Sequence, residues 1–177
     1  VSTQEITYTV EPQGVSFKCD ASLTATPNYP AAGMLLGLGY ADSGQHYKDI
    51  EYAIYCDVLG TPPFQVYEGS GGSTVPVFTD HTTITSNDEF KVQVTGNVVQ
   101  YFKNNVLLYE SNRPVPQFPL RVDTSIRNDG CAFTDVAIFS GTAVEIEVQD
   151  AVLSTTDVNA AVAGGASPGF VGSYCID

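Results

Sequence analysis

Four consecutive runs of residues in the middle of the chain constrain the fold more than any other feature. In the first run, Phe90, Val92 and Val94 alternate with polar residues, which is typical of a strand with one buried and one exposed face. Pairs of Gly and Asn residues join the first three runs, and such pairs favour two-residue hairpin turns because they tolerate positive φ. The pattern therefore predicts a four-stranded antiparallel meander. Its strands are expected at residues 89–95, 98–103, 106–110 and 120–125.

Short candidate strands also lie on both sides of this meander. No helical segment separates them, which favours an all-β fold, an antiparallel β-sandwich of two sheets (a jelly roll), over βαβ units. Gly37 and Gly39 lie inside one candidate strand, where they are expected to allow curvature or a close backbone approach. The further strands are expected at residues 5–10, 15–21, 34–40, 50–58, 64–68, 132–139 and 143–148.

The chain of 177 residues has the length of one ordinary domain. We expect the sandwich domain to span residues 1–148. The composition changes after it, because residues 154–162 fit a short helix and residues 163–169 resemble a linker. Residues 149–177 are therefore expected to form a C-terminal tail or arm that packs on the domain or on a neighbouring subunit.

The charge of the chain excludes several classes of partner. With 7 Lys and Arg residues and a net charge of −13, it lacks the basic surface that nucleic-acid binding needs. No apolar stretch is long enough for a transmembrane helix, so membrane insertion is not expected. Charged residues make up 15% of the chain, against about 25% in typical soluble domains. A surface rich in Thr, Ser, Asn and Gln is common in secreted β-proteins, which predicts an extracellular or cell-surface location.

The chain contains four cysteines without a C-x-x-C spacing, which argues against a zinc site. An even number in an acidic, Thr-rich β-chain predicts two disulfides and an oxidising compartment. Buried free thiols are the alternative, and the sequence does not choose among the three disulfide pairings. The candidates are Cys19, Cys56, Cys131 and Cys175.

Five segments of the chain, residues 37–56, 64–70, 89–111, 118–126 and 133–139, carry a resemblance to a known family. Their most specific part is the hairpin pattern V-x-Y-x-K-N-N-x-x-x-Y, followed by P-L-x-V-D. In this order they resemble concanavalin A-like domains, which include laminin G and L-type lectin domains. The resemblance implies two antiparallel sheets and a function in binding glycans or proteins.

One part of the sequence has the composition of a glycan site. Sugars stack on aromatic rings and are oriented by a few polar groups, often Asp and Asn. Tyrosines and aspartates alternate within a short loop and strand, although a tyrosine on a strand more often belongs to the core. The candidate glycan-binding residues are Tyr40, Asp42, Tyr47, Asp49 and Tyr52.

The sequence contains no convincing catalytic site, so no enzymatic activity is expected. Glu145 and Glu147 loosely resemble the acids of concanavalin-like glucanases, but a solvated strand face explains them better. His46 and His81 lie in different loops, which argues against a nucleophilic triad. No cofactor is expected. Calcium stays open, because aspartates are frequent in the loops although the motif D-x-D-x-D-G is absent.

These observations predict a non-catalytic module for recognition or adhesion that binds a glycan or a surface protein. The alternative is a structural subunit of an extracellular filament that forms a homopolymer by exchange of terminal strands. Alternating apolar residues at both ends of the strand region supply the candidate donor segments. These residues are Ile6, Tyr8, Val10, Val144, Ile146 and Val148.

Overall fold

The structure of the protein is a computed structural model that describes residues 4–20, 33–40, 47, 50–69, 75–127 and 131–141. The chain divides into two compact units, Val1–Ala143 and Val144–Asp177, and all described residues belong to the first. The predicted strand at residues 143–148, the tail at 149–177 and its helix lie outside the described residues. These predictions stay untested.

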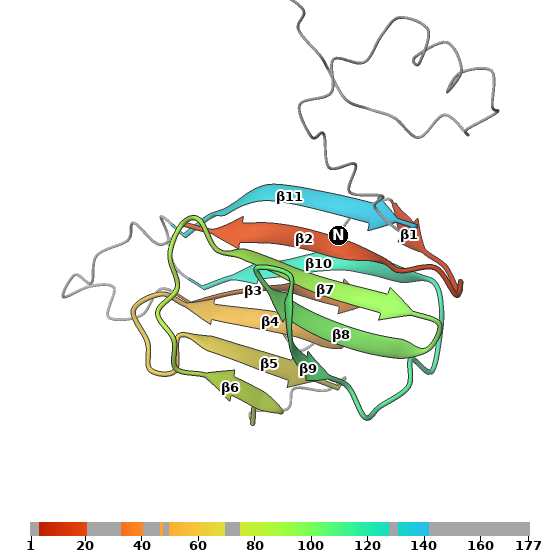
Figure 1. Ribbon diagram of the computed structural model, residues 1–177, viewed down its shortest axis with the longest axis horizontal. Helices are drawn as coiled ribbons and strands as arrows, with labels where there is room; N and C mark the ends of the chain where they lie inside the picture. The colour runs from red at the N-terminus through yellow and green to blue at the C-terminus, as the bar shows by residue number, and fades with distance from the viewer. Residues whose placement is uncertain are drawn as a thin grey trace, which may run out of the picture. The chain divides into compact units, whose positions relative to one another are not determined.

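The described residues form an antiparallel β-sandwich of two sheets (Figure 1). One sheet has six strands in the order β1-β10-β3-β4-β5-β6, and the other has five in the order β11-β2-β7-β8-β9. This arrangement confirms the predicted all-β, two-sheet fold. In the part of the chain that the structure describes, no helix is long and apolar enough to cross a membrane. The strands are β1 (Glu5–Ile6), β2 (Gln13–Cys19), β3 (Gly33–Gly39), β4 (Tyr52–Asp57), β5 (Phe64–Glu68), β6 (Phe78–Asp80), β7 (Glu89–Thr95), β8 (Val98–Lys103), β9 (Val106–Glu110), β10 (Leu120–Ile126) and β11 (Phe133–Ser140).

The two predicted hairpin turns are present between β7, β8 and β9. Gly96 has a φ of 57° at the first turn, and Asn104 and Asn105 have φ values of 52° and 61° at the second. The two successive positive φ values at Asn104 and Asn105 are those of a type I′ turn, which continues the natural twist of the strands. The local sequence therefore fixes this part of the five-stranded sheet.

The prediction of a four-stranded meander was wrong in its last strand. β10 does not pair with β9 but lies between β1 and β3 in the other sheet. Pro114, Pro116 and Pro119 lie in the connection between β9 and β10. Because proline has no backbone N–H for a ladder, this connection cannot continue a hairpin, and the chain crosses to the opposite sheet.

The N-terminal strand is shorter than predicted. Only Glu5 and Ile6 pair with β10, whereas Tyr8 and Val10 are largely exposed. Thr7–Val10 therefore does not bury the apolar face that its alternation suggested. The sequence also gave no sign of β6, because a strand of three residues carries too little alternation to stand out.

Gly37 allows β3 and β4 to approach closely, which is one of the two roles that the sequence predicted for the glycines at positions 37 and 39. A Cβ atom at this position would lie 2.0 Å from the carbonyl oxygen of Tyr52 and 2.6 Å from Cα of Ala53. Both of these atoms belong to the backbone of β4 and cannot move aside. A larger residue at position 37 would therefore separate the two strands.

The core lies between the sheets and is joined by a continuous series of aromatic contacts. Phe17 of β2 lies against Phe90 of β7, with ring centroids 5.9 Å apart. Phe90 stacks on Phe64 of the opposite sheet at 5.4 Å and 20°. Phe64 then makes an edge contact with Phe78 at 6.3 Å. These contacts bind the two sheets together without a covalent link.

Candidate functional site

A polar pocket opens where three strands of the six-stranded sheet meet the connection between β9 and β10. Its volume is about 410 Å³, which is in the range of small-molecule sites. Two tyrosines, a glutamate, an asparagine and an arginine are among the residues that line it. The lining residues, called the rim pocket below, are Tyr40, Glu51, Tyr52, Gly69, Asn112, Arg113, Pro114 and Pro116.

Backbone pairing positions the strand side of the rim pocket. Tyr52 at the start of β4 is the register partner of Glu68 at the end of β5. The N–H of Gly69 donates to the carbonyl oxygen of Glu51 at 2.8 Å, which closes the β4–β5 pair at this end. Tyr40 follows directly after β3, and its N–H donates to Oε2 of Glu51 at 3.0 Å.

A hydrogen-bond network holds the connection that forms the opposite wall. The hydroxyls of Tyr101 and Ser111 each donate to a carboxylate oxygen of Glu68 at 3.0 Å. The N–H of Arg113 donates to Oγ of Ser111, also at 3.0 Å. The hydroxyl of Tyr52 lies 3.5 Å from the carbonyl oxygen of Pro114. Glu68 therefore connects the buried core to the wall that carries Arg113.

Two buried carboxylates give the rim pocket its electrostatic character. Glu51 is 3% exposed and Glu68 is 2% exposed. Burial raises the pKa of Glu68, against the opposing effects of its hydrogen bonds with Ser111 and Tyr101 and of the Arg113 charge. Burial, followed by the nearby charge of Glu68, raises the pKa of Tyr52 to about 12. Both tyrosine hydroxyls of this network, at positions 52 and 101, are therefore neutral donors at neutral pH.

The structure divides the candidate glycan residues that the sequence grouped together. Tyr40 and Tyr52 both line the rim pocket. Tyr47 is 39% exposed and lies near Tyr67, whose pKa it helps to raise after the effect of burial. Asp42 and Asp49 lie outside the described residues.

Tyr67 marks a second aromatic surface, on the outer face of the six-stranded sheet. Its ring meets that of Tyr55 edge-on, with centroids 6.0 Å apart, and its hydroxyl donates to Oε1 of Gln65 at 2.8 Å. Both tyrosines pack against a small buried cluster of Leu35, Ile50 and Ala53. These rings are thus partly used in packing.

Sequence reasoning missed the residues of the opposite wall. Asn112 and Arg113 are far from Tyr40 and Tyr52 along the chain, and no local spacing connects them. One signal was present, because Arg113 is one of only 7 basic residues in a chain with a net charge of −13. The position of Arg113 next to Pro114, in the connection between β9 and β10, was the sequence feature that best indicated this wall.

The structure gives no arrangement for a metal among the residues it describes. No group of three His, Cys, Asp or Glu side chains gathers there in a way that could hold an ion. Asp129, like His46, Glu145 and Glu147, lies outside the described part of the chain, and His81 is exposed in the loop after β6. Whether the protein binds calcium therefore stays open. The role of Glu145 and Glu147 stays open as well, because both lie outside the described residues.

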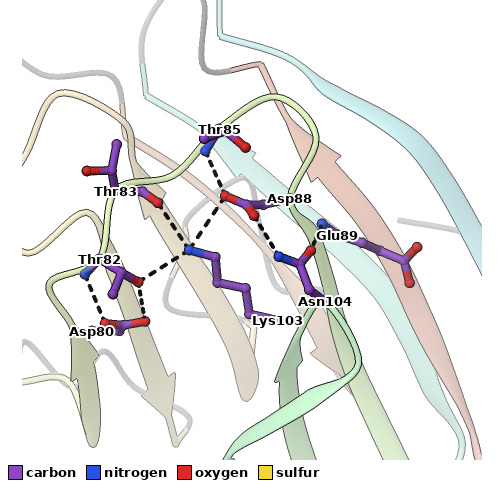
Figure 2. Close-up of polar contacts among 8 residues, drawn as sticks. All are labelled: Asp80, Thr82, Thr83, Thr85, Asp88, Glu89, Lys103 and Asn104. Carbon is purple, nitrogen blue, oxygen red and sulfur yellow. Dashed lines mark hydrogen bonds and ion pairs between the residues drawn. The ribbon is translucent and has the colours of Figure 1, made fainter.

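Lys103 at the end of β8 ties down the loop between β6 and β7 (Figure 2). Its Nζ lies 3.5 Å from Oδ2 of Asp88 and donates to the carbonyl oxygen of Thr83 at 3.1 Å. Asp88 also accepts from Nδ2 of Asn104 at 2.7 Å and from the N–H of Thr85 at 2.8 Å. Burial acts to raise the pKa of Asp88, but these hydrogen bonds and the Lys103 charge together hold it below its ordinary value.

Replacement of Asp88 by asparagine is expected to lower the free energy of unfolding by about 1–2 kcal/mol at neutral pH, because Lys103 loses its ion-pair partner and keeps only neutral hydrogen-bond acceptors. A lowered pKa stabilises the fold above the unfolded-state pKa of about 3.9, and this contribution is lost as the pH falls through the folded-state value. Urea unfolding from pH 7 to pH 3 should therefore show the two proteins converging. Asp135→Asn is the control, because its ion pair with Lys18 is on the surface. An equal loss in both variants would contradict the prediction.

Three of the cysteines lie in the described residues. Cys19 and Cys56 are fully buried, and Cys131 is partly buried beside the core. Cys175 lies outside the described residues. The two predicted disulfides stay a prediction.

Comparisons with known proteins add a similarity to solved structures. No model of a known protein family matches the chain. No curated protein matches it. Among solved structures, sheep galectin-11 in complex with glycerol is similar, with a TM-score of 0.46 and 15% identity over 77% of this chain and 95% of the galectin chain. At this TM-score and identity, the similarity says nothing about a ligand or a site in this chain.

Proposed function

We propose that this protein is a non-catalytic recognition module that binds a saccharide in the rim pocket. One observation carries the proposal: the rim pocket combines the rings of Tyr40 and Tyr52 with the polar groups of Glu51, Asn112 and Arg113. Aromatic faces pack against the apolar side of a sugar ring, while carboxylate, amide and guanidinium groups satisfy its hydroxyls. A volume of about 410 Å³ suits one or two sugar rings.

The charge of the rim pocket favours a neutral or weakly polar sugar over a strongly anionic one. Glu51 lines the pocket, and Glu68 lies directly behind it. These two carboxylates oppose the single guanidinium of Arg113, so a ligand with several negative charges would meet repulsion. We therefore place neutral oligosaccharides first among the candidate ligands.

An extracellular or cell-surface setting is part of the same proposal. Its support is the low content of charged residues, 15%, and the net charge of −13, which leave a surface built largely from hydroxyl and amide side chains. In this setting the module would serve recognition or adhesion, with a glycan or a glycosylated surface protein as its partner.

Arg113→Gln is expected to weaken saccharide binding about 10- to 100-fold, because it removes a charged hydrogen-bond donor from the rim pocket. A glycan array of neutral and acidic oligosaccharides would identify the ligand, and titration calorimetry with the best neutral glycan would measure the change. Arg121→Gln is the matched control, since Arg121 pairs with Glu5 on the edge of the six-stranded sheet. Equal affinities for the two variants would place the site elsewhere, and an array without binding would refute the proposed function.

Assembly into a filament stays the alternative. Ile6, one of the candidate donor residues, is already buried and pairs with β10 of its own chain. β11 is an edge strand of the five-stranded sheet, but a bulge between Thr134 and Ala137 interrupts its register with β2. Bulges of this kind make an edge less suited to pairing with another chain. Regular polymers in negative-stain electron microscopy would nevertheless favour this alternative.

A further inference from the structure

A glycine of the rim pocket lies directly beside the guanidinium of Arg113. Gly69 follows the last residue of β5, and its φ of 105° lies in a region that residues with a side chain rarely adopt. Its N–H donates to the carbonyl oxygen of Glu51 at 2.8 Å, which holds its backbone against β4. A Cβ atom at this position would lie 2.7 Å from Nη1 of Arg113 and 3.9 Å from Cζ. The guanidinium therefore occupies space that any side chain at position 69 would need.

The side chain of Arg113 is held less firmly than its backbone. The N–H of Arg113 donates to Oγ of Ser111 at 3.0 Å, which fixes the main chain. Within the described part of the chain, however, the guanidinium forms no ion pair and donates no hydrogen bond. Its position therefore depends on the space beside Gly69 and on attraction by nearby carboxylates such as that of Glu68.

A comparison with other glycines shows that this space is particular to Gly69. Gly96 and Gly141 also have positive φ values, of 57° and 86°. A Cβ atom at either of them would meet no other atom within 4 Å. Backbone conformation thus accounts for all three glycines, but only at Gly69, among these three, does the missing side chain make room for a charged group.

We propose that Gly69 is a positioning residue, which seats the guanidinium of Arg113 in the rim pocket at the end of the β4–β5 pair. The role in saccharide binding that follows from this rests on the proposed function. A planar guanidinium offers N–H donors in a fixed fork, which can meet two neighbouring oxygen atoms of a ligand. A Cβ atom at position 69 would displace the fork and spoil this match, while the rest of the pocket stays in place.

A titration without saccharide tests the position of Arg113 directly. Burial raises the pKa of Glu68, and the Arg113 charge acts against that rise. If Gly69→Ala displaces the guanidinium, the pKa of Glu68 should rise above its value in the wild-type protein. Carboxyl ¹³C signals, followed by NMR as the pH is changed, would measure it. An unchanged pKa of Glu68 in this variant would overturn the proposal.

The same substitution in an Arg113→Gln background separates positioning from a local effect on the neighbouring Glu68. Arg113→Gln removes the guanidinium, so it should itself raise the pKa of Glu68. Gly69→Ala should then cause no further rise, because no charge is left to displace. A rise of equal size in both backgrounds would mean that position 69 acts on Glu68 through the backbone, and the positioning role would be refuted.

Saccharide affinity gives the functional readout. The probe is the neutral oligosaccharide with the strongest array signal for the wild-type protein. Gly69→Ala should weaken its binding about 10-fold, because a charged donor is displaced. Gly141→Ala is the matched control, since it places a Cβ atom at a positive φ in open space and should change the affinity by less than about 2-fold. Equal losses would overturn the role of Gly69 in binding.

The outcomes distinguish this proposal from the proposed function. An array without any binding, together with a raised pKa of Glu68 in Gly69→Ala, would refute the saccharide site but support the seat of Arg113. If strain prevents Gly69→Ala from folding, the wild-type protein decides the question. A nuclear Overhauser effect is then expected between Hα of Gly69 and the Nη protons of Arg113. Its absence under conditions that resolve these protons would overturn the proposal.

Discussion

Replacement of Phe64 by alanine is expected to lower the free energy of unfolding by about 3–5 kcal/mol, a large part of the stability of a domain of this size. The side chain is fully buried and stacks on Phe90 of the opposite sheet at 5.4 Å. Its removal leaves a cavity between the sheets and also breaks the edge contact with Phe78. Urea unfolding followed by circular dichroism would measure the loss.

Phe102→Ala is the matched control for this prediction. Phe102 lies on β8, where it is only partly buried, and Nζ of Lys91 lies 4.4 Å from the centre of its ring. Loss of this contact and of partial burial is expected to cost about 1 kcal/mol. Similar losses in the two variants would mean that the aromatic contacts between the sheets contribute no more than a surface ring.

The sequence predicted those parts of the fold that local chemistry determines. Asn104 and Asn105 adopt the positive φ values that their turn requires, and the alternation at Phe90, Val92 and Val94 matches a strand with one buried face. Each of these features depends on neighbours within a few residues. Pattern and propensity therefore suffice for them.

The errors concern choices that depend on distant parts of the chain. The run at residues 120–126 has the composition of a strand, but its place between β1 and β3 depends on which sheet accepts it. The strand pattern around Tyr8 and Val10 fails for a related reason, because no partner strand covers these residues among those described. Alternation identifies a strand, but it does not identify the strand beside it.

In the candidate site too, the residues that are close in sequence were predicted and those that are distant in sequence were not. The sequence grouped Tyr40 and Tyr52 because they belong to one short loop and strand of alternating tyrosines and aspartates, and the pairing of β3 with β4 brings both to the rim pocket. The wall with Arg113 was missed because it reaches the site through tertiary contacts, and the hydroxyl of Tyr52 meets a carbonyl 62 residues away. Buried Glu68, which supports this wall, looks in the sequence like an ordinary strand-end acid.

Replacement of Glu68 by alanine is expected to lower the free energy of unfolding by about 2–4 kcal/mol. The change leaves the fully buried hydroxyl of Tyr101 without its acceptor and opens a cavity beside the rim pocket. It also releases Ser111, which accepts from the N–H of Arg113, so saccharide affinity should fall together with stability. Chemical denaturation and titration calorimetry on the same protein samples would measure both effects.

Glu68→Gln separates the shape of this side chain from its charge. The amide keeps the volume and one acceptor oxygen, so a change of less than about 1 kcal/mol is expected at pH 4 to 5. If both variants lost stability equally there, the cavity and the lost acceptor would not be the cause of the alanine effect. The comparison therefore also tests whether the network around Tyr101 depends on an acceptor at this position or on a negative charge.

The pH dependence of Glu68→Gln gives the sharper result. Burial raises the pKa of Glu68 in the folded state, so its favourable contribution is fully present below the unfolded-state pKa of about 4.3 and is lost as the pH rises through the folded-state value. Glutamine does not titrate and escapes this loss. The variant should therefore gain stability relative to the wild-type protein as the pH rises from 4 to 7. Asp88→Asn should show the opposite trend and lose stability relative to the wild-type protein over the same range, because the folded-state pKa of Asp88 is lowered. A difference between variant and wild type that stays constant over this range would mean that Glu68 keeps its ordinary pKa and that the hydrogen bonds from Tyr101 and Ser111 fully offset its burial.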